Sequence, residues 1–190
     1  MPIQEAIVTI QEAIVMLRGS IVVLALGACG AAAANPCVGP PPQGVPAAHS
    51  SQTAAEASNR EVVNELIEQA INRQNFDVVD RLLADDIVEH DEHQAKGVSP
   101  KQAFIDSVRG FRRAFPGGRM YVDGQVTQGD IVVTRWHSRA THGGEFMGIP
   151  ATGKAICMTG MFYDRLDGGK LKETWAVLDL FGLMQQLRAK

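Results

Sequence analysis

The sequence predicts an α+β domain in which about three helices are followed by an antiparallel sheet. Between residues 58 and 116 apolar side chains recur with helical spacing. After Gly118 apolar and polar residues alternate, as they do in strands with one buried face. The sequence Asp167-Gly168-Gly169 is typical of a tight hairpin turn. Helices that precede such a meander pack on one face of the sheet, which gives a layered domain.

The first helix is expected to begin at Ser58. Ser58 and Glu61 have the spacing of a capping box, in which two side chains satisfy free amide groups of the first turn. The apolar residues that follow fall on one face of a helix. They are Val62, Val63, Leu66, Ile67, Ala70 and Ile71.

Two more helices are expected before the sheet. A short one covers about residues 75–86 and is followed by an extended stretch over residues 87–91. The third begins at Ser99 and Pro100, because a capping serine followed by proline at the first helical position is a strong start signal. Residues 116–118, Pro-Gly-Gly, end this helix.

The second half of the domain is predicted to be four strands that form a meander. They cover residues 119–127, 131–142, 154–166 and 170–180, and each boundary coincides with a glycine-containing or polar turn. A short helical turn over residues 184–187 completes the domain.

Alternation predicts which side chains share a face of the sheet, since successive residues of a strand point to opposite sides. In the second strand the inward set is Val132, Thr134, Trp136, Ser138, Ala140 and His142, whereas Arg135, His137 and Arg139 point outward. In the last strand the set expected to point inward is Leu171, Glu173, Trp175, Val177 and Asp179. A β-bulge in either strand would reverse these assignments beyond it.

Composition argues against a nucleic-acid partner. The chain has a formal net charge of -3, whereas polyanion-binding domains have a basic excess. The only local basic cluster is Arg109, Arg112, Arg113 and Arg119. The first three share one side of a helix, which is typical of a solvated face rather than of a binding patch.

A nucleotide is also excluded, although Gly148, Gly153 and Lys154 have the spacing of a phosphate-binding loop. Such a loop needs Ser or Thr after the lysine, and it leads from a strand into a helix. Here Ala155 follows the lysine, and the next residues alternate as a strand does. The match is therefore the accident of a glycine-rich turn.

The N-terminal region has the layout of an export signal. Arg18 precedes the short apolar run from Ile21 to Leu26, which is too short for a permanent membrane span. The end of the run, Leu26-Gly27-Ala28-Cys29, resembles a bacterial lipobox, whose cysteine carries lipid after cleavage. We therefore expect a location outside the cytoplasm with a lipid anchor at Cys29. Ordinary cleavage after residues 31–34, giving a soluble secreted protein, and an internal cytoplasmic helix are the alternatives.

Three further features complete the organisation of the chain. Acidic residues upstream of Met16 are unusual in a signal, so we hypothesise that translation begins at Met16 and that residues 1–29 hold the signal and lipobox. Residues 30–58 are rich in Ala, Pro, Gly, Ser and Gln and are predicted to be a disordered tether before the domain at residues 59–190. Cys37, in the tether, could be free or paired, and Cys157 is expected to be a small buried side chain. No group of Cys and His has the spacing of a metal site.

Motifs spread over residues 60–187 resemble the SnoaL-like polyketide cyclase (ester cyclase) family. One is Thr134-Arg135-Trp136 followed by Thr141-His142-x-Gly144-x-Phe146-x-Gly148-x-Pro150-x-Thr152-Gly153-Lys154. A second is Asp86 with His90. The third is Glu173-x-Trp175-x-x-x-Asp179, followed by Phe181-Gly182-Leu183-Met184.

The resemblance implies a cone-shaped fold in which a curved sheet wraps helices around an apolar pocket. Characterised cyclases of this family close a carbocycle by an intramolecular aldol step, with no metal or organic cofactor and with an acidic residue as acid–base. On this basis Asp179 is the first candidate for the acid–base and Glu173 the second, although Asp179 could instead cap the final helix. His90 and His142 are candidate hydrogen-bond donors to a substrate carbonyl. The expected pocket walls are Trp136, Trp175, Phe146 and Phe104.

These expectations lead to two hypotheses of function. In the first, the domain binds a small apolar carbonyl compound and cyclises, isomerises or hydrates it. In the second, it is a non-catalytic domain that binds a ligand or a protein partner at the cell envelope, since a fold does not fix a function. The remaining alternative is a purely structural module that forms a homodimer, since sheets in the nuclear transport factor 2-like superfamily, to which the resemblance extends, often pair face to face.

Overall fold

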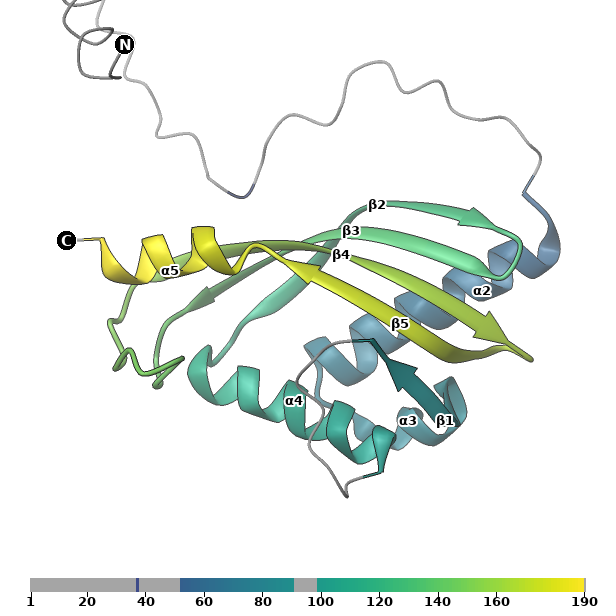
Figure 1. The fold of residues 1–190 in the computed structure, drawn as a ribbon, viewed down its shortest axis with the longest axis horizontal. Coiled ribbons are helices and arrows are strands. Elements are labelled where there is room, and N and C mark those ends of the chain that lie inside the picture. The colour runs from purple at the N-terminus through teal and green to yellow at the C-terminus, as the bar shows by residue number, and fades with distance from the viewer. Residues whose placement is uncertain (1–36, 38–51, 91–98, 190) are drawn as a thin grey trace, which may run out of the picture. The chain divides into compact units, whose positions relative to one another are not determined.

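The computed structural model describes residue 37 and residues 52–90 and 99–189. Its sheet has five strands in the order β1-β5-β4-β3-β2, and every neighbouring pair is antiparallel except β1 with β5. The strands are β1 Leu83–Glu89, β2 Arg119–Gln128, β3 Ile131–Thr141, β4 Ala155–Asp167 and β5 Lys170–Leu178. Figure 1 shows this sheet as one layer of the domain.

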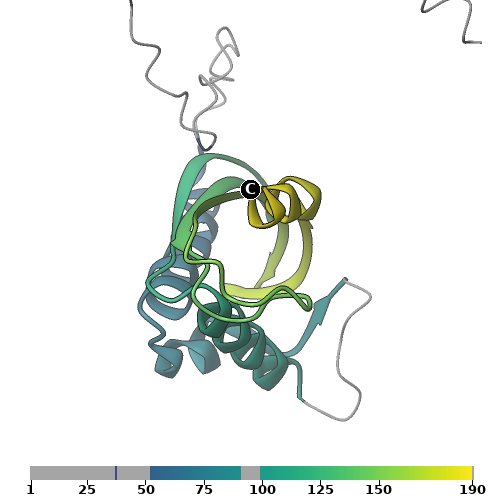
Figure 2. The same ribbon diagram turned by 90° about the vertical axis from the view of Figure 1, so that its left-hand side faces the viewer.

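The helices form the second layer. Helix α2 (Ala54–Glu65) continues as a π-helix over Leu66–Asn72 and leads, through the 3-10 turn Phe76–Val78, into the short α3 (Val79–Leu82). Helix α4 (Pro100–Ala114) lies on the same side of the sheet, and α5 (Leu180–Arg188) lies at its end (Figure 1). Figure 2 shows that the sheet curves strongly around this side without closing. The predicted α+β fold, with a curved sheet wrapped around helices, is confirmed.

The predicted strands agree with the observed ones to within two residues at each end. Ser99 caps α4 as expected, because its side chain accepts a hydrogen bond from the Gln102 amide at 3.3 Å. The final helix is longer than predicted. It begins at Leu180 rather than at residue 184, since Asp179 supplies its N-terminal cap.

Two helix boundaries were wrong. The first helix begins at Ala54, because Thr53 and Glu56 form a capping box one turn and a half before the predicted one. The second helix ends at Leu82, and the next seven residues form β1. Parallel pairing with β5, which joins Leu83 to Leu171, favours the strand over further helical turns.

The inward face of β3 is as predicted, with Val132, Thr134 and Trp136 inaccessible to solvent. The inward face of β5 is not. The register between β4 and β5 shifts between Arg165 and Leu166, so one residue of β5 is bulged out. Beyond that bulge the faces are exchanged, and Glu173 lies on the outer face.

Two apolar clusters form the core. One joins α2, the π-helix and α3 to β1, and it contains Val63, Leu66, Ile67, Leu82 and Ile87 among others. The second lies at the α5 end of the sheet, with Phe115, Trp136, Met158, Leu183 and Leu187. The two clusters are separate, and side chains from both line the same cavity.

Cys37 and Cys157 form a disulfide, with their Cα atoms 5.5 Å apart. Cys157 is buried, as predicted, and the state of Cys37, which the sequence left open, is the paired one. Met16, Cys29, the predicted signal and most of the predicted tether lie outside the described residues. None of the described helices is long and apolar enough to cross a bilayer.

Candidate functional site

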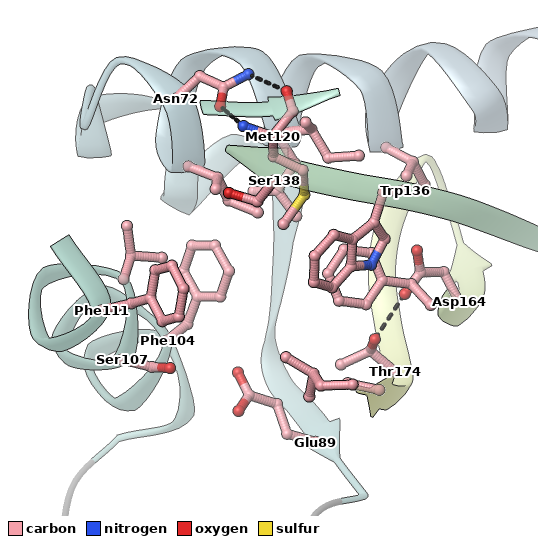
Figure 3. A pocket seen from close by; sticks show the side chains of 18 of the residues that line it. Asn72, Glu89, Phe104, Ser107, Phe111, Met120, Trp136, Ser138, Asp164 and Thr174 are labelled. Carbon is pink, nitrogen blue, oxygen red and sulfur yellow. Dashed lines mark hydrogen bonds between the residues drawn. The ribbon is translucent and has the colours of Figure 1, made fainter. Parts of the chain in front are cut away.

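A cavity of about 230 Å³ lies between the inner face of the sheet and the helices. Its walls are mainly apolar, with Leu66, Phe104, Phe111, Phe115 and Phe162 among them. An engineered cavity of roughly 150 Å³ is large enough for benzene, so this one has room for a larger apolar molecule. Figure 3 shows the few polar groups that point into it.

Asp164 is the polar group whose environment is most unusual. It lies on the inner face of β4 between Phe162 and Leu166, and its residue is only 3% exposed. Thr174, its partner across the ladder to β5, donates a hydrogen bond from Oγ1 to Oδ1 at 2.6 Å (Figure 3). Burial raises the pKa of the Asp164 carboxyl to about 7, and the bond from Thr174 opposes that rise.

A carboxyl group with a pKa near 7 can both accept and return a proton at neutral pH, which is what acid–base catalysis requires. The bulge in β5 creates this arrangement, because it turns Thr174 inward to face Asp164. Asp164 and Thr174 therefore form the chemical centre of the candidate site.

Trp136 forms the wall next to Asp164, on β3 (Figure 3). Its indole lies against Gly160 of β4, where an added Cβ would come within 2.4 Å of Cζ2. The ring of Phe162 packs on it with centroids 5.3 Å apart. Its Nε1 is buried and has no hydrogen-bond partner among the described residues. A rigid indole thus brings an unsatisfied donor to the cavity wall.

Arg112 brings positive charge to the cavity from α4. Its guanidinium donates to the backbone carbonyls of Ile71 at 2.8 Å, of Asn72 at 2.9 Å and of Gly118. In the described part of the chain no carboxylate pairs with it, and burial lowers the pKa of its guanidinium. A positive charge held in this way stabilises negative charge that develops on a bound molecule.

Two further polar groups at the cavity are Glu89 and Ser107. Figure 3 shows the Glu89 carboxylate, at the end of β1, and the Ser107 hydroxyl, on α4, on the side of the cavity away from Trp136. Phe104, predicted as a wall residue, lines the cavity near them. Polar groups at two ends of an apolar cavity can orient an elongated ligand.

Three predicted site residues come together outside the cavity centre, at the outer face of β5. His90 stacks on Trp175 with ring centroids 4.0 Å apart, and its Nε2 lies 2.9 Å from Oε2 of Glu173. Arg165 donates from Nε to the other oxygen of Glu173 at 2.9 Å. The hydrogen bonds from Arg165 and then from His90 lower the pKa of Glu173. His90 also borders the cavity, whereas Glu173 and Trp175 do not line it.

Asp179 does not line the cavity either. It is exposed, and its Oδ1 accepts a hydrogen bond from the Gly182 amide at 2.8 Å. This is the helix-capping arrangement that the sequence left open as its alternative role. The geometry therefore does not bring the first predicted acid–base residue to the cavity.

His142 and Phe146 lie behind the cavity wall. His142 is fully buried, and its Nδ1 accepts a hydrogen bond from the Thr152 amide at 3.3 Å, which fixes the loop after β3. Phe146 packs edge-on against Phe115 at a centroid distance of 5.0 Å. Neither residue lines the cavity, so of the predicted wall residues Trp136 and Phe104 do so and Phe146 and Trp175 do not.

Sequence reasoning missed Asp164, although a signal was present. Asp164 alternates with Phe162 and Leu166, so strand periodicity alone places a carboxylate on an apolar face. No cluster of three or more His, Cys, Asp or Glu side chains that could hold a metal occurs within residues 52–90 and 99–189.

Comparison with known proteins agrees with the fold described above. The family model described as SnoaL-like polyketide cyclase matches residues 61–187. No curated protein matches the chain at a significant level. Among solved structures, IdmH from Streptomyces antibioticus, a candidate polyketide cyclase, is 29% identical with a TM-score of 0.60, over 68% of this chain and 97% of its own.

Two further structures are similar. AclR from Streptomyces galilaeus, a candidate hydroxylase, is 28% identical with a TM-score of 0.61, over 70% of this chain and 96% of its own. A candidate SnoaL-like polyketide cyclase from Jannaschia sp. CCS1 is 22% identical with a TM-score of 0.64, over 73% of this chain and 96% of its own. At that identity the last likeness concerns the fold alone.

Proposed function

The chain belongs to the SnoaL-like polyketide cyclase family, and from this premise we propose that it abstracts a proton next to the carbonyl group of a small apolar compound. Asp164 is the acid–base. The single observation that carries the proposal is its burial on an apolar face with a pKa raised to about 7. That environment is the one in which a carboxylate becomes a strong enough base for a carbon acid at neutral pH.

The proposed reaction starts with the ionised carboxylate. It takes a proton from the carbon beside the substrate carbonyl, and the electron pair of that C–H bond moves into the enolate. The enolate carbon then forms a bond to a second carbonyl of the same molecule, and the alkoxide that results takes the proton back from Asp164. No net proton or electron is consumed, so the step needs no cofactor.

Three further groups that line the cavity support this chemistry. Thr174 Oγ1 holds one carboxylate oxygen, Oδ1, which leaves the other for the substrate. Trp136 Nε1 is a buried donor without a partner among the described residues, and it can donate to an enolate oxygen. The positive charge of Arg112 lowers the energy of the anionic intermediate. The apolar walls exclude water, which strengthens each of these interactions.

The test is hydrogen exchange at carbon, which requires no knowledge of the natural substrate. We would measure the exchange of the α-hydrogens of 2-tetralone in D₂O by NMR, with wild type and with Asp164→Asn. We expect the asparagine variant to lose catalysed exchange by about 10²- to 10⁴-fold, the usual contribution of a general base, while it still binds the ketone. Exchange that continues unchanged would reject the proposal.

Asp179→Asn is the matched control. It changes the carboxylate that the sequence favoured, which caps α5 outside the cavity. We expect normal exchange from this variant. Loss of exchange in Asp179→Asn alone would instead restore the acid–base role to Asp179. Binding of the ketone by wild type without any exchange would support the non-catalytic alternative.

We also propose that the domain works outside the cytoplasm on a lipid anchor at Cys29. The apolar run behind Arg18 and the lipobox-like end support this. The disulfide between Cys37 and Cys157 supports it independently, because disulfides persist in oxidising compartments and are rare in the cytosol. We expect Cys29→Ser to move the protein from the membrane fraction to the soluble fraction. Retention of that variant in membranes would count against lipidation.

A further inference from the structure

The disulfide gives the chain a second attachment point to its own domain. Cys157 alternates along β4 with Met158, which lines the cavity, so Cys157 lies on the outer face of the sheet. Cys37 is joined to it there, 120 residues away in sequence. The chain is therefore fixed at Cys37 to the outer face of the sheet, on the side away from the cavity.

The length of chain before this point is short. Cys37 lies eight positions after Cys29, and in any conformation this stretch spans at most ~28 Å. Without the disulfide, the chain would first meet the domain at α2, which begins at Ala54. That path is 25 residues long and can reach roughly 90 Å.

The diameter of the domain decides how this difference in tether length affects the orientation of the domain. A compact domain of this length is roughly 35 Å across, so a path halfway round it is on the order of 55 Å. A tether of ~28 Å cannot run that far, whereas one of roughly 90 Å can. A domain held through Cys37 therefore cannot turn its cavity side to the surface that holds Cys29.

We propose that the Cys37–Cys157 disulfide orients the domain on a membrane, with the outer face of the sheet toward the lipid and the side of α4 and β1 away from it. The proposal rests on the lipid anchor proposed above. In this orientation the exposed cavity residue Ser107, on α4, faces the surrounding solution. The cavity can then exchange apolar ligands without obstruction by the bilayer.

Charge and exposed apolar side chains around Cys157 fit an anionic membrane surface. The ladder places Arg139 directly beside Cys157, and Arg119 is next in the same row. Arg119 pairs with Glu68, while Arg139 is exposed and has no ion-pair partner in the described part of the chain. Val177, on the outer face of β5 and paired with Met161 of β4, is 70% exposed. Basic residues attract anionic lipids, and exposed apolar ones favour the interface.

The test measures which face lies near the lipid. An azide-bearing amino acid is encoded at Met161, on the outer face, or at Asp106, on the exposed side of α4, and is labelled with a fluorescent donor. Full-length lipidated protein is reconstituted in vesicles of phosphatidylethanolamine and phosphatidylglycerol that carry acceptor lipids. We expect stronger energy transfer from position 161 than from position 106. We expect this difference to be lost in Cys37→Ser/Cys157→Ser, which keeps Cys29.

Reduction of the wild-type disulfide with a phosphine gives the same comparison if the double variant does not fold. Equal transfer from the two positions in the oxidised, vesicle-bound protein would overturn the inference and leave the lipid anchor intact. Weaker transfer from position 161, together with a dimeric mass, would show a second copy on this face and also overturn it. Failure to bind vesicles at all would reject the anchor and this inference together, and the exchange experiment with 2-tetralone would be unaffected.

Discussion

The two faces of the sheet at β4 and β5 carry carboxylates in opposite electrostatic states. On the inner face Asp164 has one hydrogen bond, from Thr174, and burial raises its pKa to about 7. One rung away on the outer face, Glu173 is held by Arg165 and His90, which lower its pKa. The two residues are chemically alike. Their surroundings decide that one can exchange protons at neutral pH while the other stays an anion.

This difference shows why residue type and motif were weak guides to the site. Glu173 belongs to the recognisable pattern with Trp175, yet it forms an ion pair on the surface. Asp164 belongs to no motif that the sequence singled out, and it occupies the cavity. The face of the sheet that each carboxylate occupies decides its surroundings, and for Glu173 a single bulge in β5 sets that face.

The largest effect we expect is on the pH dependence of stability. The pKa of Asp164 is about 7 in the folded protein and 3.8 in the unfolded chain, so the folded state keeps a proton that the unfolded state releases. The contribution of this protonated carboxyl group to the free energy of unfolding is complete below pH 4, and it is lost as the pH rises to about 7. The loss amounts to about 4 kcal/mol, at 1.36 kcal/mol per pKa unit. Asp164→Asn should remove it, and urea unfolding at pH 4 and pH 8 measures it.

The outer face supplies the control for that experiment. Carboxylates with lowered pKa values, such as Glu173, give the opposite slope, so only the difference between wild type and variant reports Asp164. We expect the variant to be more stable than wild type at pH 8 and nearly equal to it at pH 4. A constant difference at the two pH values would contradict the assignment.

The next largest effect is expected from packing behind the site. An alanine Cβ at residue 160 would lie 2.4 Å from Trp136 and 2.6 Å from the Val177 carbonyl, so the wall cannot accept it without movement. Gly160→Ala should cost about 1–3 kcal/mol in the free energy of unfolding, as overpacked cores do. Gly124→Ala, in β2 with open space around it, is the matched control. Equal losses from the two variants would show that the indole is not held as described.

A smaller effect should come from the hydrogen bond within the site. Thr174→Val keeps the shape of the side chain and removes the donor that lowers the pKa of Asp164. We expect the midpoint of the pH–rate profile for 2-tetralone exchange to move up by roughly one pH unit. Thr174→Ser should restore the wild-type midpoint. An unchanged midpoint in the pH–rate profile of Thr174→Val would show that Thr174 does not influence the pKa of the proposed acid–base.

The smallest effect is expected on the outer face. Glu173→Gln removes the ion pairs with Arg165 and His90 but creates no cavity, and these side chains are in contact with solvent. Exposed pairs of this kind contribute about 0–1 kcal/mol, which urea unfolding should confirm. Exchange of 2-tetralone should be unchanged. A large loss of exchange would show that the outer face takes part in the reaction, which the geometry does not indicate.

Local sequence patterns were sufficient to predict the strands and the start of α4, whereas tertiary contacts decide which side chains line the cavity. The four meander strands and the start of α4 at Ser99 follow from alternation and capping, which involve only neighbouring residues. The inward face of β5 does not, because the bulge depends on how Arg165 and Leu166 pair with the facing strand. The disulfide likewise joins residues far apart, so no local pattern at Cys37 predicts it.

The position of the proposed acid–base shows the same limit. Asp179 was placed inward by counting along β5 from Leu171, and that count passes over the bulge. Asp164 needed only the alternation of β4, which has no register shift against β3. A carboxylate between two apolar residues on the inward face of a regular strand was therefore the more reliable indication of which acidic side chain lines the cavity.

The most direct test of the central claim is the pKa of Asp164 itself. The carboxyl carbons of protein labelled with ¹³C-aspartate can be titrated by NMR, and Asp164→Asn identifies the resonance. We expect a midpoint near 7 for this group, raised by burial on the inner face. A midpoint near 3.8, the ordinary value for an aspartate, would show a solvated anion and would contradict the proposed acid–base.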